Sequence, residues 1–499
     1  MDDSINYIST RGDGERVRPA AAVIRGLAPD RGLYVPEALP VLPCRPDDLK
    51  EASYRDVARK TLAAFLTDFT EEELAACAGS AYDEKFDMPA IAPVVKTGKA
   101  HFLELWHGPT AAFKDMALSI LPWLLTTAVR KEGEQKKIAI LTATSGDTGK
   151  AALAGFADVP GTEIVVFYPK DGVSVVQERQ MLTQTGGNVH VYGIRGNFDD
   201  AQTGVKDAFS DATFAEELAL DGIRLSSANS INIGRLAPQV AYYVYAYAQM
   251  LASGGIASGE QINICVPTGN FGNILSAWYA KQMGLPVRRL ICASNENKVL
   301  TDFINTGVYD ARRDFILTSS PSMDILVSSN LERLLWHLSG GDSERIRKLM
   351  AELAESGVYN AGADVKASLH EFYGGYAGMA DSHAALCALW CDEGYLLDTH
   401  TAVAYTVYLD YRAQTGDDTK TLIVSTASPY KFAGSVAGAL SLPAGRDEFR
   451  TILNLATATG LPVPESLRGL ESKAVIHDSV IEKTDVKAAI RATLRSGGA

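Results

Sequence analysis

The chain has 499 residues, of which 46% are hydrophobic and 21% charged, a composition typical of a soluble globular protein with two or three domains. Its formal net charge is −13 and no basic patch stands out, so a nucleic-acid partner is not expected. No apolar run of about 18 residues is present, so no membrane span is expected. The start, residues 1–4, is acidic and polar, unlike a secretory signal, and the sequence predicts a cytoplasmic location.

Residues 1–92 are predicted to form a mostly helical N-terminal region. Several prolines come first, and two amphipathic patterns then predict helices over 54–69 and 71–81. Thr70 is placed to cap the second of these helices.

From residue 93 onward, short β-branched runs alternate with helical patterns, which predicts parallel sheets covered by helices on both faces. The predicted strands are 137–141, 164–168, 189–192, 262–266, 290–293 and 422–425, and the predicted helices are 110–131, 149–157, 201–219, 236–252, 272–283 and 402–415.

The strands fall into two groups, which predicts an α/β protein with two open, mainly parallel sheets. The smaller α/β unit is expected over 131–193, and the larger unit over 93–130, 194–299 and 396–450. Residues 300–395 are predicted to be a helical insertion, with one amphipathic helix over 343–357. Residues 451–499 are predicted to be a C-terminal segment with a helix over 485–495.

Lys114 lies among small, aromatic and apolar residues, with no other lysine or arginine between 100 and 129. An amine that is partly desolvated and has no cationic neighbour has a lowered pKa and can attack a carbonyl group. This is the property required of a lysine that holds pyridoxal 5′-phosphate (PLP) as a Schiff base. A lysine at a helix start that points to solvent is the ordinary alternative.

Three turns rich in glycine, serine or threonine follow predicted strands, where ligands of open parallel sheets bind. The first, 142–149, has hydroxyl groups and open amides that suit a carboxylate. A phosphate-binding P-loop is excluded there, because its first glycine would fall at Thr144 and its hydroxyl residue at Ala151.

The second turn, 267–273, has two glycines at a helix start, an arrangement that suits a phosphate monoester. In the third, 425–429, a hydroxyl group could bond a pyridine nitrogen. Structural turns are the alternative for both. A polar segment, 226–235, opens a further helix and could form a second anion site through its one arginine, or could simply cap that helix.

Six cysteines are scattered along the chain. Cys387 and Cys391 are one helical turn apart, with His383 nearby. Buried structural cysteines are favoured over a metal site here, since further ligands are missing. No metal is expected.

Taken together, these motifs resemble threonine synthase, a PLP enzyme of fold type II, in its longer microbial and fungal branch. The motifs follow the family order along most of the chain: 7–12, 32–36, 107–117, 145–149, 229–232, 269–272, 398–404 and 425–427.

The resemblance implies conversion of O-phospho-L-homoserine and water to L-threonine and phosphate. It implies that Lys114 holds the cofactor and acts as the catalytic base, and that Thr426 bonds the pyridine nitrogen. The cofactor phosphate would be bound by Gly269, Asn270, Phe271, Gly272 and Asn273. Substrate would be bound by Thr144, Ser145, Asp147, Thr148, Ser230, Asn232 and Arg235. Many relatives of this fold type have Asn at the position of Asp147, so a contact of Asp147 with the cofactor does not carry over directly.

Three cations are candidates for the departing phosphate: Arg235 first, then Lys150 and Lys170. The expected assembly is a monomer or a homodimer. Another fold type II activity, such as a threonine or serine dehydratase, is the alternative enzyme, and it needs no site for a γ-phosphate. A catalytically silent relative that binds a ligand is the alternative from a different class.

Overall fold

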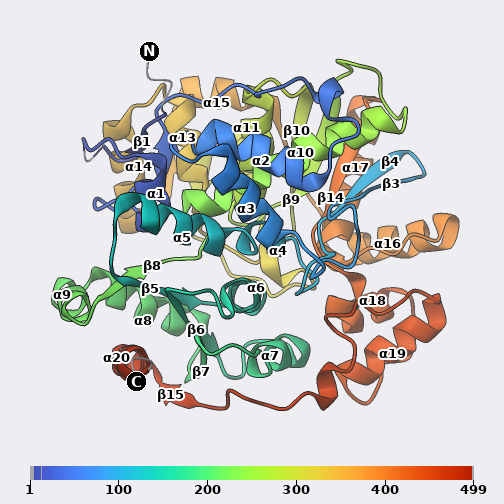
Figure 1. Cartoon of the computed structure of the whole chain (residues 1–499). Coiled ribbons are helices and arrows are strands. Elements are labelled where there is room, and N and C mark those ends of the chain that lie inside the picture. The colour runs from blue at the N-terminus through green and yellow to red at the C-terminus, as the bar shows by residue number, and fades with distance from the viewer. Residues whose placement is uncertain (1–4, 13, 497–499) are drawn as a thin grey trace.

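The computed structural model describes residues 5–12 and 14–496, so the acidic start at residues 1–4 lies outside the described part. The chain forms a large upper unit and a smaller lower unit, each built around one sheet (Figure 1). None of the described helices is both long and apolar enough to cross a membrane.

The large sheet is parallel except for its last pair, β4 and β3. Its strands run in the spatial order β13 (Phe372–Tyr376), β10 (Val287–Ser294), β9 (Ile262–Pro267), β14 (Thr421–Ser425), β4 (Ala100–Glu104) and β3 (Val94–Thr97). Helices α10 (Ile233–Ala252), α11 (Gly272–Gln282) and α17 (Thr399–Thr415) contact this sheet, and α4 (Asp115–Leu118) and α5 (Leu121–Glu132) pack against α10.

The small sheet is parallel throughout. Its strands run in the order β15 (Val480–Glu482), β7 (Val189–Arg195), β6 (Thr162–Pro169), β5 (Lys137–Ala143) and β8 (Ile223–Ser226). Its helices are α6 (Asp147–Phe156), α7 (Val175–Leu182), α8 (Phe198–Ser210), α9 (Ala212–Leu220) and α20 (Val486–Ser496).

Alternation along the buried strands explains why helices cover both faces of the small sheet. Ile138 and Ile140 of β5 share one core cluster with residues of α6 and α7. Ala139 and Leu141 point the other way and share a second cluster with residues of α8, α9 and α20. Because successive side chains of a strand face opposite sides, an uninterrupted apolar strand requires cover on both. The prediction of two mainly parallel sheets is confirmed.

The N-terminal region contains α1 (Pro19–Arg25), α2 (Tyr54–Phe65) and α3 (Glu71–Ala81), together with a short antiparallel pair, β1 (Tyr7–Ser9) and β2 (Tyr34–Pro36). Thr70 caps α3 as predicted: its side chain accepts a hydrogen bond from the Glu73 N–H, and the Glu73 carboxylate accepts one from the Thr70 N–H. This reciprocal pair satisfies two N–H groups that the helix leaves open.

The insertion holds α12 (Val299–Thr306), α13 (Leu331–Leu338), α14 (Ser343–Ser356), α15 (Ala363–Ser368) and α16 (Met379–Glu393), and a short pair of strands, β11 (Val308–Asp310) and β12 (Val358–Asn360). It is not wholly helical, because β13 adds an edge strand to the large sheet. Cys387 of α16 is only partly buried and Cys391 is exposed, so the expectation of buried cysteines is wrong for this pair.

Two predicted helices are broken in the structure. The segment 110–131, expected to be one helix, is a turn followed by α4 and α5. The two helices do not join, because Pro122 has no N–H group to continue the helical hydrogen bonds of α4. The helix expected over 201–219 is divided at Asp211, whose side chain accepts a hydrogen bond from the Phe214 N–H and starts α9.

The strand pairing also extends the small unit, expected over 131–193, beyond residue 193. β7 continues to Arg195, and β8, which was not predicted, pairs with β5. Residues 198–226, expected in the larger unit, therefore lie with the small sheet.

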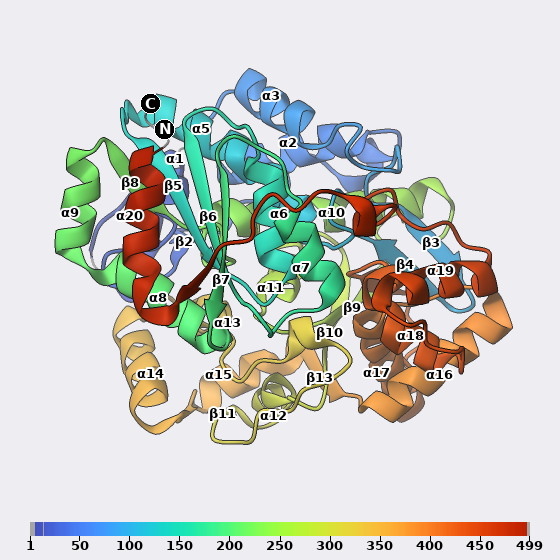
Figure 2. The same ribbon diagram turned by 90° about the horizontal axis from the view of Figure 1, so that it is seen from below.

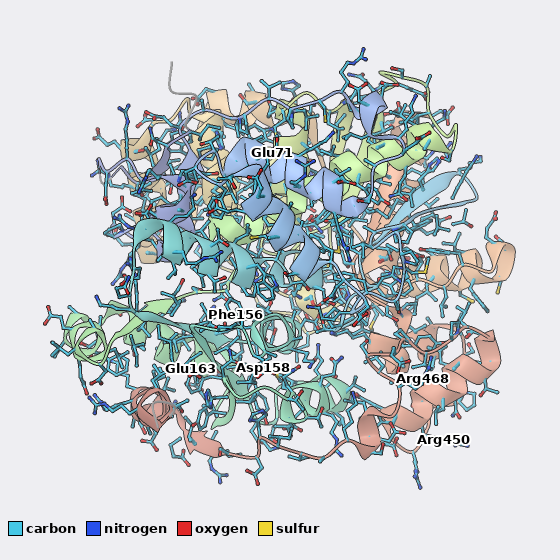
Figure 3. All side chains as sticks on the ribbon, viewed as in Figure 1. Glu71, Phe156, Asp158, Glu163, Arg450 and Arg468 are labelled. Atoms are coloured by element: carbon cyan, nitrogen blue, oxygen red, sulfur yellow. The ribbon has the colours of Figure 1, made fainter. Side chains whose placement is uncertain are left out.

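The C-terminal segment connects the two units. After α18 (Ala433–Ala439) and α19 (Glu448–Thr459), beside the large unit, it runs past α7 to β15 and α20 on the small unit (Figure 2). Arg179 of α7 donates hydrogen bonds to the carbonyl groups of Glu471 and Lys473, and the Ile476 N–H donates to the Leu182 carbonyl. Figure 3 labels Arg450 at the start of α19, Arg468 on this segment, and Phe156, Asp158 and Glu163 on the small unit.

Candidate active site

Lys114 lies in the loop that follows β4, at the residue before α4. The loop is held against the end of β14: the Phe113 N–H donates to the Thr426 carbonyl at 2.8 Å, and the Ser428 N–H donates to the Ala111 carbonyl at 3.0 Å. The lysine is thereby fixed at the carboxyl end of the large sheet, next to a second turn that the sequence predicted to be functional.

The amine of Lys114 reaches the small unit. Its Nζ is 3.4 Å from Asp147 Oδ2 and 3.5 Å from Ser322 Oγ, and its side chain is 12% exposed. Burial lowers the pKa of Lys114; the Asp147 carboxylate opposes this, and the charges of Arg235 and Lys431 add to the lowering. The alternative of a solvent-directed lysine is therefore excluded.

Asp147, at the start of α6, is surrounded by donors. Its Oδ1 is 3.0 Å from Lys431 Nζ and accepts a hydrogen bond from Gln177 Nε2 at 2.9 Å, and its Oδ2 accepts one from Ser322 Oγ at 3.0 Å. Burial would raise the pKa of Asp147, but the ammonium groups of Lys431 and Lys114 outweigh it and hold this pKa far below its usual range. Asp147 is thus a buried, ionised carboxylate.

The turn at 142–149 is held together by its own side chains. Thr144 Oγ1 accepts hydrogen bonds from the N–H groups of Gly146 and Gly149, so this hydroxyl is used within the turn. Ser145 is exposed and Thr148 half-buried. Gly146 has φ of +131°, and a Cβ there would lie 2.5 Å from the Gln177 side chain, so only glycine fits.

The turn at 269–273 opens α11. Phe271 has φ of +63°, and the next residues begin the helix, so the helix N-terminus faces the turn. A Cβ on Gly269 would lie 2.9 Å from the Ser322 carbonyl oxygen. The Asn270 carbonyl accepts hydrogen bonds from the backbone and side-chain N–H groups of Asn330.

The side-chain amide of Asn273, in this turn, is hydrogen-bonded within the described part of the chain through its oxygen but not through its nitrogen. Its Oδ1 accepts hydrogen bonds from the hydroxyl groups of Tyr242 and Tyr243, at 2.6 and 2.5 Å. Its Nδ2 is buried and has no partner among the described residues. An unpaired buried donor costs free energy, about 1–3 kcal/mol, unless a ligand accepts from it.

Thr426 lies at the end of β14 and is 6% exposed. Its N–H donates to Thr401 Oγ1 at 3.3 Å, and Thr401 in turn donates to Asp398. Thr426 therefore lies beside the Lys114 loop with its backbone fixed from both sides.

The segment at 230–235 is divided in its roles. Asn232 caps α10: its Oδ1 accepts from the Gly234 N–H and its Nδ2 donates to the Val23 and Ser227 carbonyl groups, so the whole amide is used locally. Ser230 lies close to Gly272, since a Cβ on that glycine would be 3.8 Å from Ser230 Cβ.

Arg235 is 5% exposed and donates to the Ala228 carbonyl through Nη1, and its Nε has no partner among the described residues. No carboxylate is recorded as its ion-pair partner in the described part of the chain, and burial lowers the pKa of Arg235 to about 10. A buried guanidinium with open donors and no counter-ion suits an anionic ligand.

The other two candidate cations point elsewhere. Lys170 forms an ion pair with Glu178 at 2.6 Å. Lys150 is buried between α6 and α7, where its Nζ donates to Gln184, and burial lowers its pKa to about 7.

Several residues of the site were not among the predicted ones: Gln177, Ser322, Lys431, and the pair formed by Asp398 and His400. His400 Nε2 accepts a hydrogen bond from the Ser322 N–H, while its Nδ1 lies 3.0 Å from Asp398 Oδ1. Ser322 belongs to the insertion, and no local pattern marks it. Two signals were available: Lys431 follows the turn at 425–429 by two residues, and Asp398 and His400 lie in the motif at 398–404.

These groups fit PLP. The turn at 269–273, with the unpaired Asn273 Nδ2, offers donors for a phosphate, and Lys114 offers an amine of lowered pKa. Thr426 is bonded through its carbonyl group to the loop that carries Lys114. No group of three metal-ligating side chains is present in residues 5–12 and 14–496.

Family models match three consecutive parts of the chain: "Threonine synthase N terminus" over 6–82, "Pyridoxal-phosphate dependent enzyme" over 89–427, and "Threonine synthase, C-terminal" over 401–490. Among curated proteins, "Threonine synthase-like 1" of Pongo abelii is 38% identical over 97% of this chain. The chain spans only 65% of the length of that relative.

Threonine synthase of Pseudomonas aeruginosa is 36% identical, with 87% of this chain and 90% of that protein covered. The crystal structure of PLP-bound threonine synthase from Brucella melitensis superposes with a TM-score of 0.87 at 34% identity, covering 99% of this chain and 100% of that one. The chain therefore belongs to the threonine synthase family of pyridoxal-phosphate-dependent enzymes.

Proposed function

We propose that the protein is a threonine synthase that converts O-phospho-L-homoserine and water to L-threonine and phosphate. The observation that carries this proposal is Arg235, a buried cation without a recorded carboxylate partner, whose charge acts on Lys114. The cofactor phosphate has its own donors in the turn at 269–273. A second anion-binding site, formed by Arg235, therefore favours a substrate that carries a phosphate of its own.

In this proposal Lys114 holds PLP, and Gly269, Asn270, Phe271, Gly272 and Asn273 surround the cofactor phosphate. Thr426 bonds the pyridine nitrogen. When bound, PLP withdraws electrons from the substrate and stabilises negative charge at its Cα.

The chain's own groups then handle protons and the leaving group. Lys114 Nζ, whose pKa is lowered by burial, takes up and returns protons at the substrate Cα and Cβ. Arg235, with Ser230 beside the turn, holds the departing phosphate. Ser145, Thr148 and the start of α6 hold the substrate carboxylate. Thr144, Asn232 and Asp147 act by fixing the turns, because their side chains are already bonded within the protein.

The test is phosphate release from O-phospho-L-homoserine by the PLP-loaded protein, with threonine detected by mass spectrometry. Arg235→Met should raise KM for this substrate at least tenfold, because one charge-assisted contact is worth about 1.5–3 kcal/mol. The same variant should lose the thermal stabilisation that inorganic phosphate gives the parent, so binding is read independently of turnover.

Two results would contradict the proposal. Ammonia and a keto acid formed from threonine or serine, without turnover of the phosphorylated substrate, would indicate the dehydratase alternative. A visible cofactor band that persists in Lys114→Ala, or a borohydride-reduced adduct mapped to another residue, would remove Lys114 from its role. A cytoplasmic location and a monomeric or homodimeric assembly stay predictions from the sequence, and the assembly is tested by light scattering of the loaded protein.

A further inference from the structure

Lys431 is a fully buried lysine in the wall of the site. Its side chain is 0% exposed, and its Nζ is 2.7 Å from the Thr110 carbonyl oxygen and 3.0 Å from Asp147 Oδ1. Thr110 lies in the same loop as Lys114, and Asp147 lies in the small unit. One ammonium group therefore joins the loop of Lys114 to the start of α6.

Asp147 consequently lies between two amines, with Lys431 at one carboxylate oxygen and Lys114 at the other. The charged groups that act on Lys114 come from three elements: Asp147 of α6, Arg235 of α10, and Lys431 of the segment after β14. Gln177 and Ser322, which also contact Asp147, are neutral.

A carboxylate alone in this position would stabilise the protonated form of Lys114. A charge within about 4–6 Å of a buried amine shifts its pKa by about 1–3 units, enough to leave almost none of the amine neutral. A lysine that must act as a nucleophile or base cannot tolerate that. Lys431 prevents Asp147 from stabilising the protonated form of Lys114 in this way, since Asp147 and Lys431 together carry no net charge.

We propose that Lys431 is a positioning residue: it neutralises Asp147, so that this carboxylate can orient Lys114 without holding it permanently protonated. The inference rests on the proposed role of Lys114 as the amine that holds the cofactor. It explains how an aspartate can stand where a neutral amide would otherwise be expected, because the ion pair replaces the amide as a neutral unit.

The test is a pH titration of the visible absorption of the PLP-loaded full-length chain, which follows protonation of the Lys114 nitrogen. Lys431→Met should raise the midpoint by about one unit or more, because it removes a repelling charge and leaves Asp147 unpaired. Asp147→Asn should move the midpoint the opposite way, to lower pH. The double variant, Asp147→Asn with Lys431→Met, should return it to within about 0.3 unit of the parent, since both charges are gone.

Lys150→Met is the matched control. Lys150 is also buried, but its Nζ bonds Gln184, and its charge is not among those that act on Lys114. The midpoint should not change in this variant. An equal shift in Lys150→Met, an unchanged midpoint in Lys431→Met, or a double variant that behaves like Lys431→Met would each overturn the inference. If Lys431→Met does not fold, the double variant is compared with Asp147→Asn, because the two differ only in the charge of residue 431. The midpoint of the double variant should be the higher one, and equal midpoints would overturn the inference.

A second readout separates this inference from the proposed function. After the cofactor is removed, the full-length chain is treated with trace acetic anhydride, and acetylation of the Lys114 peptide is quantified against pH by mass spectrometry. Lys431→Met should be acetylated at Lys114 about tenfold more slowly than the parent at pH 8, because less neutral amine is present. This result does not depend on which amino acid the enzyme converts, so a wrong substrate would leave it standing, and equal rates would reject the role of Lys431.

Discussion

Asn273 shows how a single amide can serve both the apoprotein and the proposed cofactor site. Its oxygen is held by two tyrosine hydroxyl groups, while its Nδ2 is buried without a partner in the described part of the chain. The hydroxyl groups fix the side chain, so the open N–H group points in one direction before any ligand arrives. This is preorganisation: the donor is desolvated in advance and regains a partner on binding.

Asn273→Asp tests this arrangement. The aspartate oxygen keeps both acceptor bonds, but the donor becomes a negative charge beside the proposed phosphate. PLP affinity is expected to fall at least tenfold, measured by equilibrium titration of the cofactor absorption. The melting temperature of the cofactor-free protein should fall as well, because the new carboxylate is buried. A variant with unchanged PLP affinity would place the phosphate elsewhere.

At this scale the sequence predicted the turns better than the contacts inside them. Lys114 could be found because it is isolated from other cations, and residues 269–273 because glycines flank a helix start. Ser322 could not be found, because its position beside Lys114 depends on how the insertion folds back over β9. Neither could the local use of Asn232 be foreseen, since a capping amide and a ligand-binding amide look alike in a sequence.

Among the elements, α17 has an N-terminus that serves the site as well as the helix. Asp398 caps α17, accepting from the His400 N–H at 2.8 Å and, more weakly, the Thr401 N–H at 3.4 Å, and the same carboxylate contacts the His400 ring and the Thr401 hydroxyl. Through His400 it fixes the Ser322 N–H, and through Thr401 the Thr426 N–H. One cap thus orients two loops at the site.

Asp398→Asn should therefore affect stability and catalysis together. The amide retains one acceptor oxygen, so at least one of the four contacts is lost and a buried donor is left open. The free energy of unfolding should fall by about 1–3 kcal/mol, with a lower kcat, measured by denaturant titration and steady-state kinetics.

Asp342→Asn is the control, because Asp342 caps α14 with its side chain exposed and, among the described residues, bonded to the Arg345 N–H alone. Asparagine caps a helix as well as aspartate does, so this variant should leave both quantities unchanged. Equal effects of the two substitutions would mean that capping alone explains the loss.

Elements with a strong period were predicted well, and those that depend on distant partners were not. The strand at 262–266 and the helix at 71–81 match β9 and α3 closely, because residues within these segments determine their burial and capping. The strands of the two main sheets that were missed are β3, β4, β8, β13 and β15. Each is a short run of three to five residues, and all except β4 lie at the edge of a sheet, where only pairing with a neighbour makes the run a strand.

At the level of the whole molecule, His107 ties the N-terminal region to the large unit. Its Nδ1 lies 2.7 Å from Asp87 Oδ1, and its Nε2 lies 2.9 Å from Glu104 Oε2 at the end of β4. Burial alone would lower the pKa of His107, but the two carboxylates outweigh it and raise the pKa to about 9.

A raised pKa of this kind makes stability depend on pH in one direction. His107 contributes its full share of the unfolding free energy below its unfolded-state pKa of about 6.5. This stabilisation is lost as the pH rises through about 9, where the ring of the folded protein loses its proton. The parent should therefore lose up to about 3 kcal/mol of unfolding free energy between these pH values relative to His107→Gln, measured by urea titration at a series of pH values. Parallel curves for parent and variant would show that the ring stays neutral in the folded protein.

The two main sheets could be predicted from the order of strands and helices, whereas the two short antiparallel pairs and the division of the chain between the main sheets could not. Residues 198–226 belong to the small unit because β8 pairs with β5, and residues 480–496 belong to it because β15 pairs with β7. Both pairings join segments far apart in sequence, and no local pattern records them.

The late position of β15 has a consequence for how the protein is made. Until residues 480–482 have left the ribosome, β7 has no neighbour on its outer side, so the nascent chain carries an open strand edge that could pair with another molecule. The small unit is thus finished after the large one, although most of it is translated earlier, and efficient biogenesis depends on keeping that edge covered in the interval.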